Sequence, residues 1–193
     1  IRRNTGVFPG YRRNHAKGVC ILGAFRSSGL AASISRAAVY APGATSPVVG
    51  RLAVPGSNPY AADASVPIRS LALRFALPNG QQWRTGMNAM PVFAVATPQA
   101  FYAQLQAQQP VPATGKPDPA RLAAFFAAHP ETAPFRAWAR TATASPSYAT
   151  ERYNSLDAFE FVDSRGRRQA VRWSMVDRKS TRLNCHLGIS YAV

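Results

Sequence analysis

Cysteine, acidic residues and long apolar runs are all scarce in this chain of 193 residues. The two cysteines, Cys20 and Cys185, show no Cys-x-x-Cys or Cys/His ligand spacing, which argues against a structural zinc site and a disulfide framework. No apolar run approaches the roughly 20 residues that a membrane helix needs, so no membrane partner is expected. No signal peptide is visible after Ile1, and the compartment stays unknown.

The scarcity of acid leaves a large positive charge. Eight Asp and Glu stand against 23 Lys and Arg, which gives +15, while 47% hydrophobic residues favour a folded core. Such a charge is typical of nucleic-acid binding, but the arginines are scattered rather than gathered in a dense tail, and the base-stacking motif of RNA-binding sheets is absent. A solvated basic surface without a nucleic-acid partner is the favoured interpretation. A basic β-barrel nucleic-acid-binding protein is kept as an alternative.

The last 17 residues, from Asp177 to Val193, read DRKSTRLNCHLGISYAV and have no apolar periodicity. They resemble the translation of a common sequencing adapter. We therefore interpret 177–193 as an artefactual tail and exclude it from fold reasoning. On this interpretation the natural protein continues beyond Val176, and 1–176 is one core cut short at both ends.

Short apolar stretches between turn residues predict strands in the first half of the chain. The clearest alternation places Leu71, Leu73 and Phe75 on one face of a strand. The predicted strands are Gly18–Phe25, Pro47–Val54, Ile68–Leu77, Gln82–Thr85 and Pro91–Val95.

Helix start signals follow. Thr97-Pro98 and Asp118-Pro119 each join a capping residue to a proline at the first helical position, and Pro130 opens a third short helix. Two further strands, Ala158–Val162 and Ala170–Met175, enclose a turn. The order of strands, helices and strands predicts an α+β domain with a mainly antiparallel sheet or barrel.

His15 is the candidate catalytic residue that the local sequence suggests. It follows Arg12 and Arg13 and precedes an apolar strand, so nearby positive charge would keep its imidazole neutral and able to accept a proton. His129 lies at a predicted helix C-terminus, where capping explains it, and it is assigned no function.

The segment around His15, YRRNHAKGVCILGAF, resembles the distal-site segment of haem catalases, which carry R-x-x-H-A-K-G before the first barrel strand. The similarity is closer to the small catalase-related peroxidases. NPYAAD, VPIRSLALRFALPNGQQWRT, MNAMPVF, TPQAFYAQL, HPET, YNSLDAFEF and VRWSMV follow in the order of that subfamily. The resemblance covers Phe8 to Val176 and implies a catalase-like antiparallel β-barrel with helical insertions, incomplete in this chain.

The resemblance also implies the catalytic residues. Its distal histidine matches His15, and its distal asparagine matches Asn88, three residues before Pro91. In such a site, a neutral histidine accepts a proton from one peroxide oxygen and returns it to the other. The asparagine holds the peroxide by a hydrogen bond.

The cofactor implied is haem b (heme b), with its iron. Arg12 and Arg51 match arginines that pair with haem propionates, anions that are costly to bury unpaired. Phe93 and Phe101 match phenylalanines on the distal face of the haem. The proximal tyrosine ligand of the family would lie beyond Val176, so no metal ligand is assigned in this chain.

Two departures from the family bear on activity. Ala53 stands where the family often has a serine that hydrogen-bonds the distal histidine, and Asn14 stands where large catalases have a valine that shields the haem. Both favour a peroxidase that reduces hydrogen peroxide or organic peroxides with an organic electron donor and has weak or no catalase activity. A haem enzyme that rearranges hydroperoxides on the same scaffold is the second alternative. The resemblance makes a periplasmic location plausible and leaves the oligomeric state unknown.

Overall fold

The structure, a computed structural model, describes residues 6–65, 68–78 and 80–177. Apart from Asp177, the predicted artefactual tail lies outside these residues. So does Cys185, whereas Cys20 is a free, exposed thiol. No helix in the described part of the chain is both long enough and apolar enough to cross a membrane.

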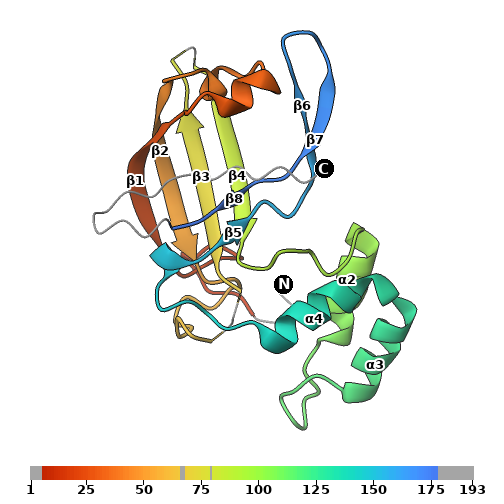
Figure 1. The fold of residues 1–193 in the computed structure, drawn as a ribbon. Helices are drawn as coiled ribbons and strands as arrows, with labels where there is room; N and C mark the ends of the chain where they lie inside the picture. The colour runs from red at the N-terminus through yellow and green to blue at the C-terminus, as the bar shows by residue number, and fades with distance from the viewer. Residues whose placement is uncertain (1–5, 66–67, 79, 178–193) are drawn as a thin grey trace.

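A six-stranded antiparallel sheet dominates the fold (Figure 1), with the strand order β1-β2-β3-β4-β5-β8. The first four strands follow one another along the chain, and the last two return from its C-terminal part. The strands are β1 (Gly18–Arg26), β2 (Thr45–Ala53), β3 (Ser70–Ala76), β4 (Gln82–Asn88), β5 (Tyr153–Asn154) and β8 (Ser174–Met175).

The register of these strands sorts their side chains into two faces, because directly paired residues point to the same side. One face, which we call the open face, carries two rows of small and polar residues across the first four strands. The first row is Gly18, Ala53, Ser70 and Asn88, and the second is Cys20, Arg51, Ala72 and Gly86.

The opposite face carries the main hydrophobic core. Leu71, Leu73 and Phe75 of β3 are buried there, as the alternation in the sequence predicts. Phe75 stacks on Trp83 with ring centroids 4.3 Å apart, and Trp83 meets Trp173 at 5.4 Å. The short helices η1 (Leu30–Ser33) and η2 (Ala38–Tyr40) and the hairpin of β6 (Phe159–Val162) with β7 (Arg168–Val171) contribute further residues to this core.

The helices gather beyond one end of the sheet (Figure 1) and form a second, smaller core around Val95, Ala100 and Phe125. Thr97 Oγ1 accepts a hydrogen bond from the Ala100 amide, and Asp118 Oδ1 accepts one from Ala120, so both predicted N-caps are confirmed. The helices of this group are α2 (Pro98–Ala107), α3 (Pro119–Ala128), η3 (Pro130–Thr132) and α4 (Ala133–Thr141). The short helix η4 (Tyr148–Thr150) lies apart from them, just before β5.

Most of the predicted strands are confirmed, with small shifts at their ends, but two predictions are wrong. The strand predicted at Ala170–Met175 is two strands, β7 and β8, which belong to different sheets. The strand predicted at Pro91–Val95 is absent. This segment is irregular in the structure. Its proline has no amide hydrogen for a strand ladder, and Ala94 and Val95 pack in the helical core. The apolar run therefore reflects burial between sheet and helices.

Candidate functional site

A pocket of about 150 Å³ lies on the open face, at the end of the sheet where β2 and β4 end and β3 begins. Four of the six site residues proposed from the sequence line it together. Its lining consists of Arg12, His15, Arg51, Ala53, Ser70, Leu71, Ala72, Gly86, Met87 and Asn88.

Local contacts hold His15 in a turn immediately before β1. Its φ of 53° is left-handed, a backbone region that residues other than glycine seldom adopt. The Asn14 Oδ1 atom accepts hydrogen bonds from the His15 amide at 3.0 Å and from the Gly56 amide at 2.8 Å. From the other side, Arg51 donates to the carbonyl oxygens of His15 at 2.7 Å and Ala16 at 3.2 Å. The site thus begins with a strained turn tied to β2.

The surroundings of His15 favour its neutral form. Burial lowers the pKa of its imidazole below the ordinary value, and the positive charges of Arg12 and Arg51 lower it further. Its Nδ1 atom is buried and has no hydrogen-bond partner in the structure. A neutral imidazole at a pocket wall can accept a proton from a bound molecule.

Asn88 is the last residue of β4, and the side chain of Ser70 on β3 holds it. The Ser70 hydroxyl and the Asn88 Oδ1 atom form a short hydrogen bond between directly paired residues. The chain after Asn88 is also fixed, because Ala89 donates its amide to the Arg69 carbonyl at 2.8 Å and accepts from Asn154 Nδ2 at 3.1 Å. The amide of Asn88 is therefore presented from a rigid strand end.

Two arginines give the pocket its charge. The residues that line it include Arg12 and Arg51 but neither Asp nor Glu. Burial lowers the pKa of the Arg51 guanidinium, and the positive charge of Arg12 adds to this effect. Arg51 uses two of its five N–H groups on backbone carbonyls, so donors remain for an anion. The pair is suited to carboxylate groups.

Phe93 and Phe101 lie elsewhere, outside the residues that line the pocket. Their ring centroids are 5.5 Å apart with the planes tilted by 49°. Both rings are partly exposed, at 42% and 41%, which is unusual for paired phenylalanines and leaves one side of the pair open.

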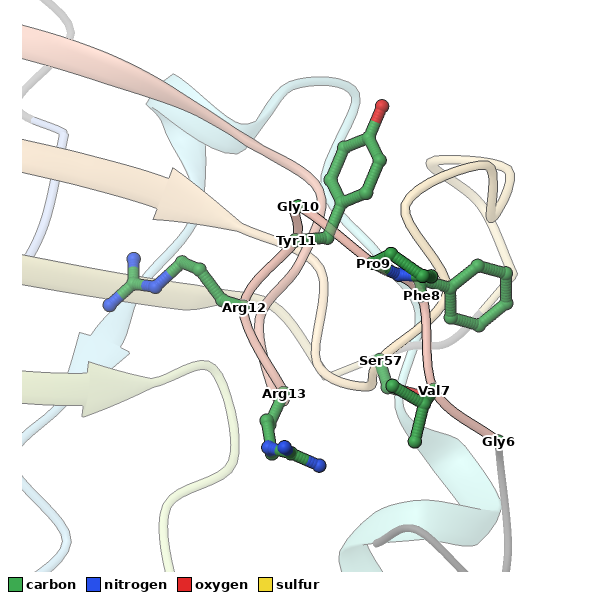
Figure 2. A pocket seen from close by; sticks show the side chains of 9 residues that line it. All are labelled: Gly6, Val7, Phe8, Pro9, Gly10, Tyr11, Arg12, Arg13 and Ser57. Carbon is green, nitrogen blue, oxygen red and sulfur yellow. The ribbon is translucent and has the colours of Figure 1, made fainter.

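A second pocket, of about 160 Å³, adjoins the first because Arg12 lines both. The N-terminal segment from Gly6 to Arg13, together with Ser57, forms its wall. In Figure 2, Arg12 extends toward the strands of the sheet, whereas Arg13 and Phe8 point in other directions. The two neighbouring arginines point in different directions, and only Arg12 lines the pocket of the candidate site as well.

The sequence did not single out Ser70 or the structural part played by Asn14. Ser70 is paired with Asn88 in the structure, but the return strand predicted from the sequence ends at Thr85 and does not reach Asn88. The Tyr153 hydroxyl donates a hydrogen bond to the Tyr148 carbonyl at 2.7 Å, and burial raises the pKa of Tyr153. Among the described residues, no group of three His, Cys, Asp or Glu could hold a metal ion.

Comparison with known proteins places these observations in a family. The family model described as Catalase matches residues 9–185. A "Catalase-related peroxidase" of Synechococcus elongatus is 39% identical over 176 residues, which are 91% of this chain and 52% of that protein. A protein of the same name from Mycolicibacterium paratuberculosis is 32% identical over 177 residues, covering 91% of this chain and 55% of the relative. The chain thus spans about half the length of these curated relatives.

The fold agrees with the sequence comparison. A solved "Structure of a bacterial catalase" superimposes with a TM-score of 0.72 at 19% identity, covering 86% of this chain and 32% of that one. The predicted α+β class and the incomplete catalase-like antiparallel sheet are confirmed. The chain belongs to the catalase family.

Proposed function

We propose that this chain forms the distal side of a haem peroxidase site, which reduces hydrogen peroxide or an organic peroxide with electrons from an organic donor. One observation carries the proposal. Three separate parts of the chain, which supply Arg12 with His15, Arg51 and Asn88, line one small pocket. The names of the two relatives support the same activity.

The residues of the open face fit a flat, anionic cofactor such as haem b. The open face has few protruding side chains at Ala53, Ala72 and Gly86, so a flat molecule could lie close to the sheet. A Cβ atom added at Gly86 would meet no atom within 4 Å. Arg12 and Arg51 would hold the propionates. The pocket of about 150 Å³ is small beside ligand sites of about 300–1,000 Å³, so it suits peroxide rather than a whole cofactor.

Phe93 and Phe101 would contact the haem ring with the exposed parts of their side chains, and would exclude water from that part of the haem. In the described part of the chain no tyrosine lines the pocket. His15 and Asn88 would therefore act on the peroxide, and we propose that the protein ligand of the haem iron comes from sequence beyond Val176.

In the proposed mechanism, His15 and Asn88 divide the work on peroxide. Haem, when bound, supplies the redox chemistry that breaks the O–O bond, and the organic donor replaces the two electrons consumed. The neutral His15 imidazole takes a proton from one peroxide oxygen and delivers it to the oxygen that leaves as water. The Asn88 amide donates a hydrogen bond that orients the peroxide without exchanging a proton.

Haem binding and peroxide-dependent oxidation of a dye test this proposal together. In the haem-loaded full-length protein, which supplies the sequence beyond Val176, H15A should retain the Soret absorbance but abolish peroxide-dependent oxidation, with H129A as the matched control. R12Q and R51Q should weaken haem binding, whereas R140Q, which removes the same charge from α4, should not. Full activity in H15A, or unchanged haem affinity in R12Q and R51Q, would refute the assignment.

The same protein separates the alternatives. Rearranged products from a fatty-acid hydroperoxide, with no oxidation of the donor, would favour a hydroperoxide-rearranging enzyme. Affinity for DNA or RNA that falls steeply with salt, in a protein without Soret absorbance, would favour the nucleic-acid-binding alternative.

A further inference from the structure

We infer that Ser70 is a positioning residue that fixes the amide of Asn88, so that the Nδ2 atom, rather than Oδ1, faces the pocket. The inference concerns the orientation of the amide, and its value for catalysis rests on the proposed function. It assigns a specific task to a serine on a strand that carries none of the proposed catalytic or haem-binding residues.

The contact between the two side chains is built into the sheet. Ser70 and Asn88 are directly paired on the antiparallel strands β3 and β4, where facing side chains lie closest. Ser70 is buried, with 7% of its surface exposed, and its hydroxyl meets the Asn88 Oδ1 atom in a short hydrogen bond. Neither partner sits on a loop, so the geometry does not depend on a flexible segment.

The hydrogen-bond acceptors near the Ser70 hydroxyl determine which of the two side chains donates. If the Asn88 amide were rotated by half a turn, Nδ2 would donate to the serine oxygen, and the hydroxyl proton would need a second acceptor. In the described part of the chain Ser70 Oγ has Asn88 as its side-chain partner, and the next residue in the row is Ala53, which has no polar side-chain atom. A buried hydroxyl without an acceptor is unfavourable, so Ser70 donates to Oδ1.

The orientation of the Asn88 amide determines whether the pocket presents a hydrogen-bond donor or an acceptor to a peroxide. With Oδ1 occupied by Ser70, Asn88 turns two N–H donors away from the serine, and one can bond to an oxygen lone pair. The rotated amide would instead present an acceptor, which competes with His15 for the peroxide proton. The unpartnered Nδ1 atom of His15 shows that this hydroxyl serves the asparagine and not the histidine.

NMR of the chain labelled with ¹⁵N and ¹³C at asparagine tests the orientation without haem or peroxide. The sequence has seven asparagines, and N88D assigns the side-chain amide of Asn88 by removing its signal. We expect no strong nuclear Overhauser effect between the Asn88 Hδ2 protons and the Ser70 Hβ protons. S70A should shift the Asn88 amide signals and accelerate their exchange with solvent, and S70T should restore both.

S46A is the matched control, because Ser46 is also a buried serine in the sheet but is paired with Phe25 on the other face. It should leave the Asn88 signals unchanged. A strong effect between Asn88 Hδ2 and Ser70 Hβ, or Asn88 signals that do not respond to S70A, would overturn the inference.

Kinetics of the haem-loaded full-length protein, which includes the sequence beyond Val176, then address the catalytic value of the arrangement. S70A should lower kcat/KM for peroxide by about tenfold, the effect expected from one misplaced hydrogen bond, and S70T should restore it. If the expected NMR results are obtained but no variant or wild-type protein oxidises the donor, the proposed function fails while the orientation of Asn88 stands. If the wild type is active and S70A has the same kcat/KM, the positioning role is refuted.

Discussion

Replacing Gly18 with alanine should disturb the site through a contact that a single methyl group would make. Gly18 begins β1 and is paired with Ala53 on the open face. A Cβ atom built there would lie 2.4 Å from the Leu52 carbonyl oxygen and 2.7 Å from Cζ of Arg51. The guanidinium that ties His15 to β2 therefore occupies the space that any side chain at position 18 would need.

The expected cost follows from these contacts. Adding a methyl group at a position that is already closely packed lowers the free energy of unfolding by about 1–3 kcal/mol. If Arg51 moves away, its two hydrogen bonds to the His15 and Ala16 carbonyls are lost, at about 0.5–1.5 kcal/mol each. Alanine restricts the unfolded chain and returns about 0.4–1 kcal/mol. We expect G18A to lower the free energy of unfolding by about 2–4 kcal/mol.

Urea unfolding followed by circular dichroism measures this effect, and two other glycines in the sheet serve as controls. Cβ atoms added at Gly23 in β1 and Gly86 in β4 would meet no atom within 4 Å. G23A and G86A should therefore not lower the stability and should raise it by up to about 1 kcal/mol, through the restricted unfolded chain. The His15 ring signals in NMR should shift in G18A and not in G23A. If G18A proves as stable as both controls, the close packing of Arg51 over Gly18 is wrong.

Three further predictions concern charged groups. Burial, Arg12 and Arg51 lower the pKa of His15 in the folded chain, so as the pH falls below about 6.5 the unfolded chain takes up a proton on His15 before the folded chain does. The free energy of unfolding should therefore decrease over this pH range. R12Q should raise the His15 pKa in an NMR titration and reduce that loss; an unchanged pKa would contradict it. Hydrogen bonds from Arg167 and the Arg165 amide lower the pKa of Asp163, so D163N should lower the urea midpoint at neutral pH, and this deficit should shrink in acid. R69M would remove the guanidinium 3.7 Å from the partly buried carboxylate of Glu151, which keeps its hydrogen bonds from Ser145. It should lower the free energy of unfolding in urea by about 1–3 kcal/mol, and an unchanged stability would contradict the contribution of this pair.

Local signals in the sequence were sufficient for most of the secondary structure. The alternation around Leu73 identified β3 and its buried face, and the proline that follows each capping residue located α2 and α3. The strand predicted at Pro91–Val95 is wrong because an apolar run indicates that a segment is buried, but does not indicate whether the buried backbone is a strand or irregular. β5, only two residues long, has no local pattern to detect, since its pairing with Asn88 and Ser174 depends on distant parts of the chain.

The site was less accessible to local reasoning. Arg12 and His15 are close in sequence, but Arg51 and Asn88 join them only through the register of four strands. Their selection depended on the family resemblance, and their shared pocket is a property of the fold. Ser70 shows what a motif cannot supply, because its importance lies in which residue stands directly opposite on the next strand.

The large positive charge of the chain acquires a more specific meaning at this pocket. Dispersed arginines on a surface cost little, because water and salt screen them. Arg12 and Arg51 are different, since Arg12 contributes to the lowered pKa of Arg51 and no carboxylate is present among the residues that line the pocket. The fold therefore holds two positive charges near each other, and their repulsion lowers the stability of the folded chain. A bound dianion that neutralises both arginines would remove this repulsion. Haem carries two propionates on one edge, so its binding should stabilise the folded chain through these two arginines, by an amount that grows with haem concentration.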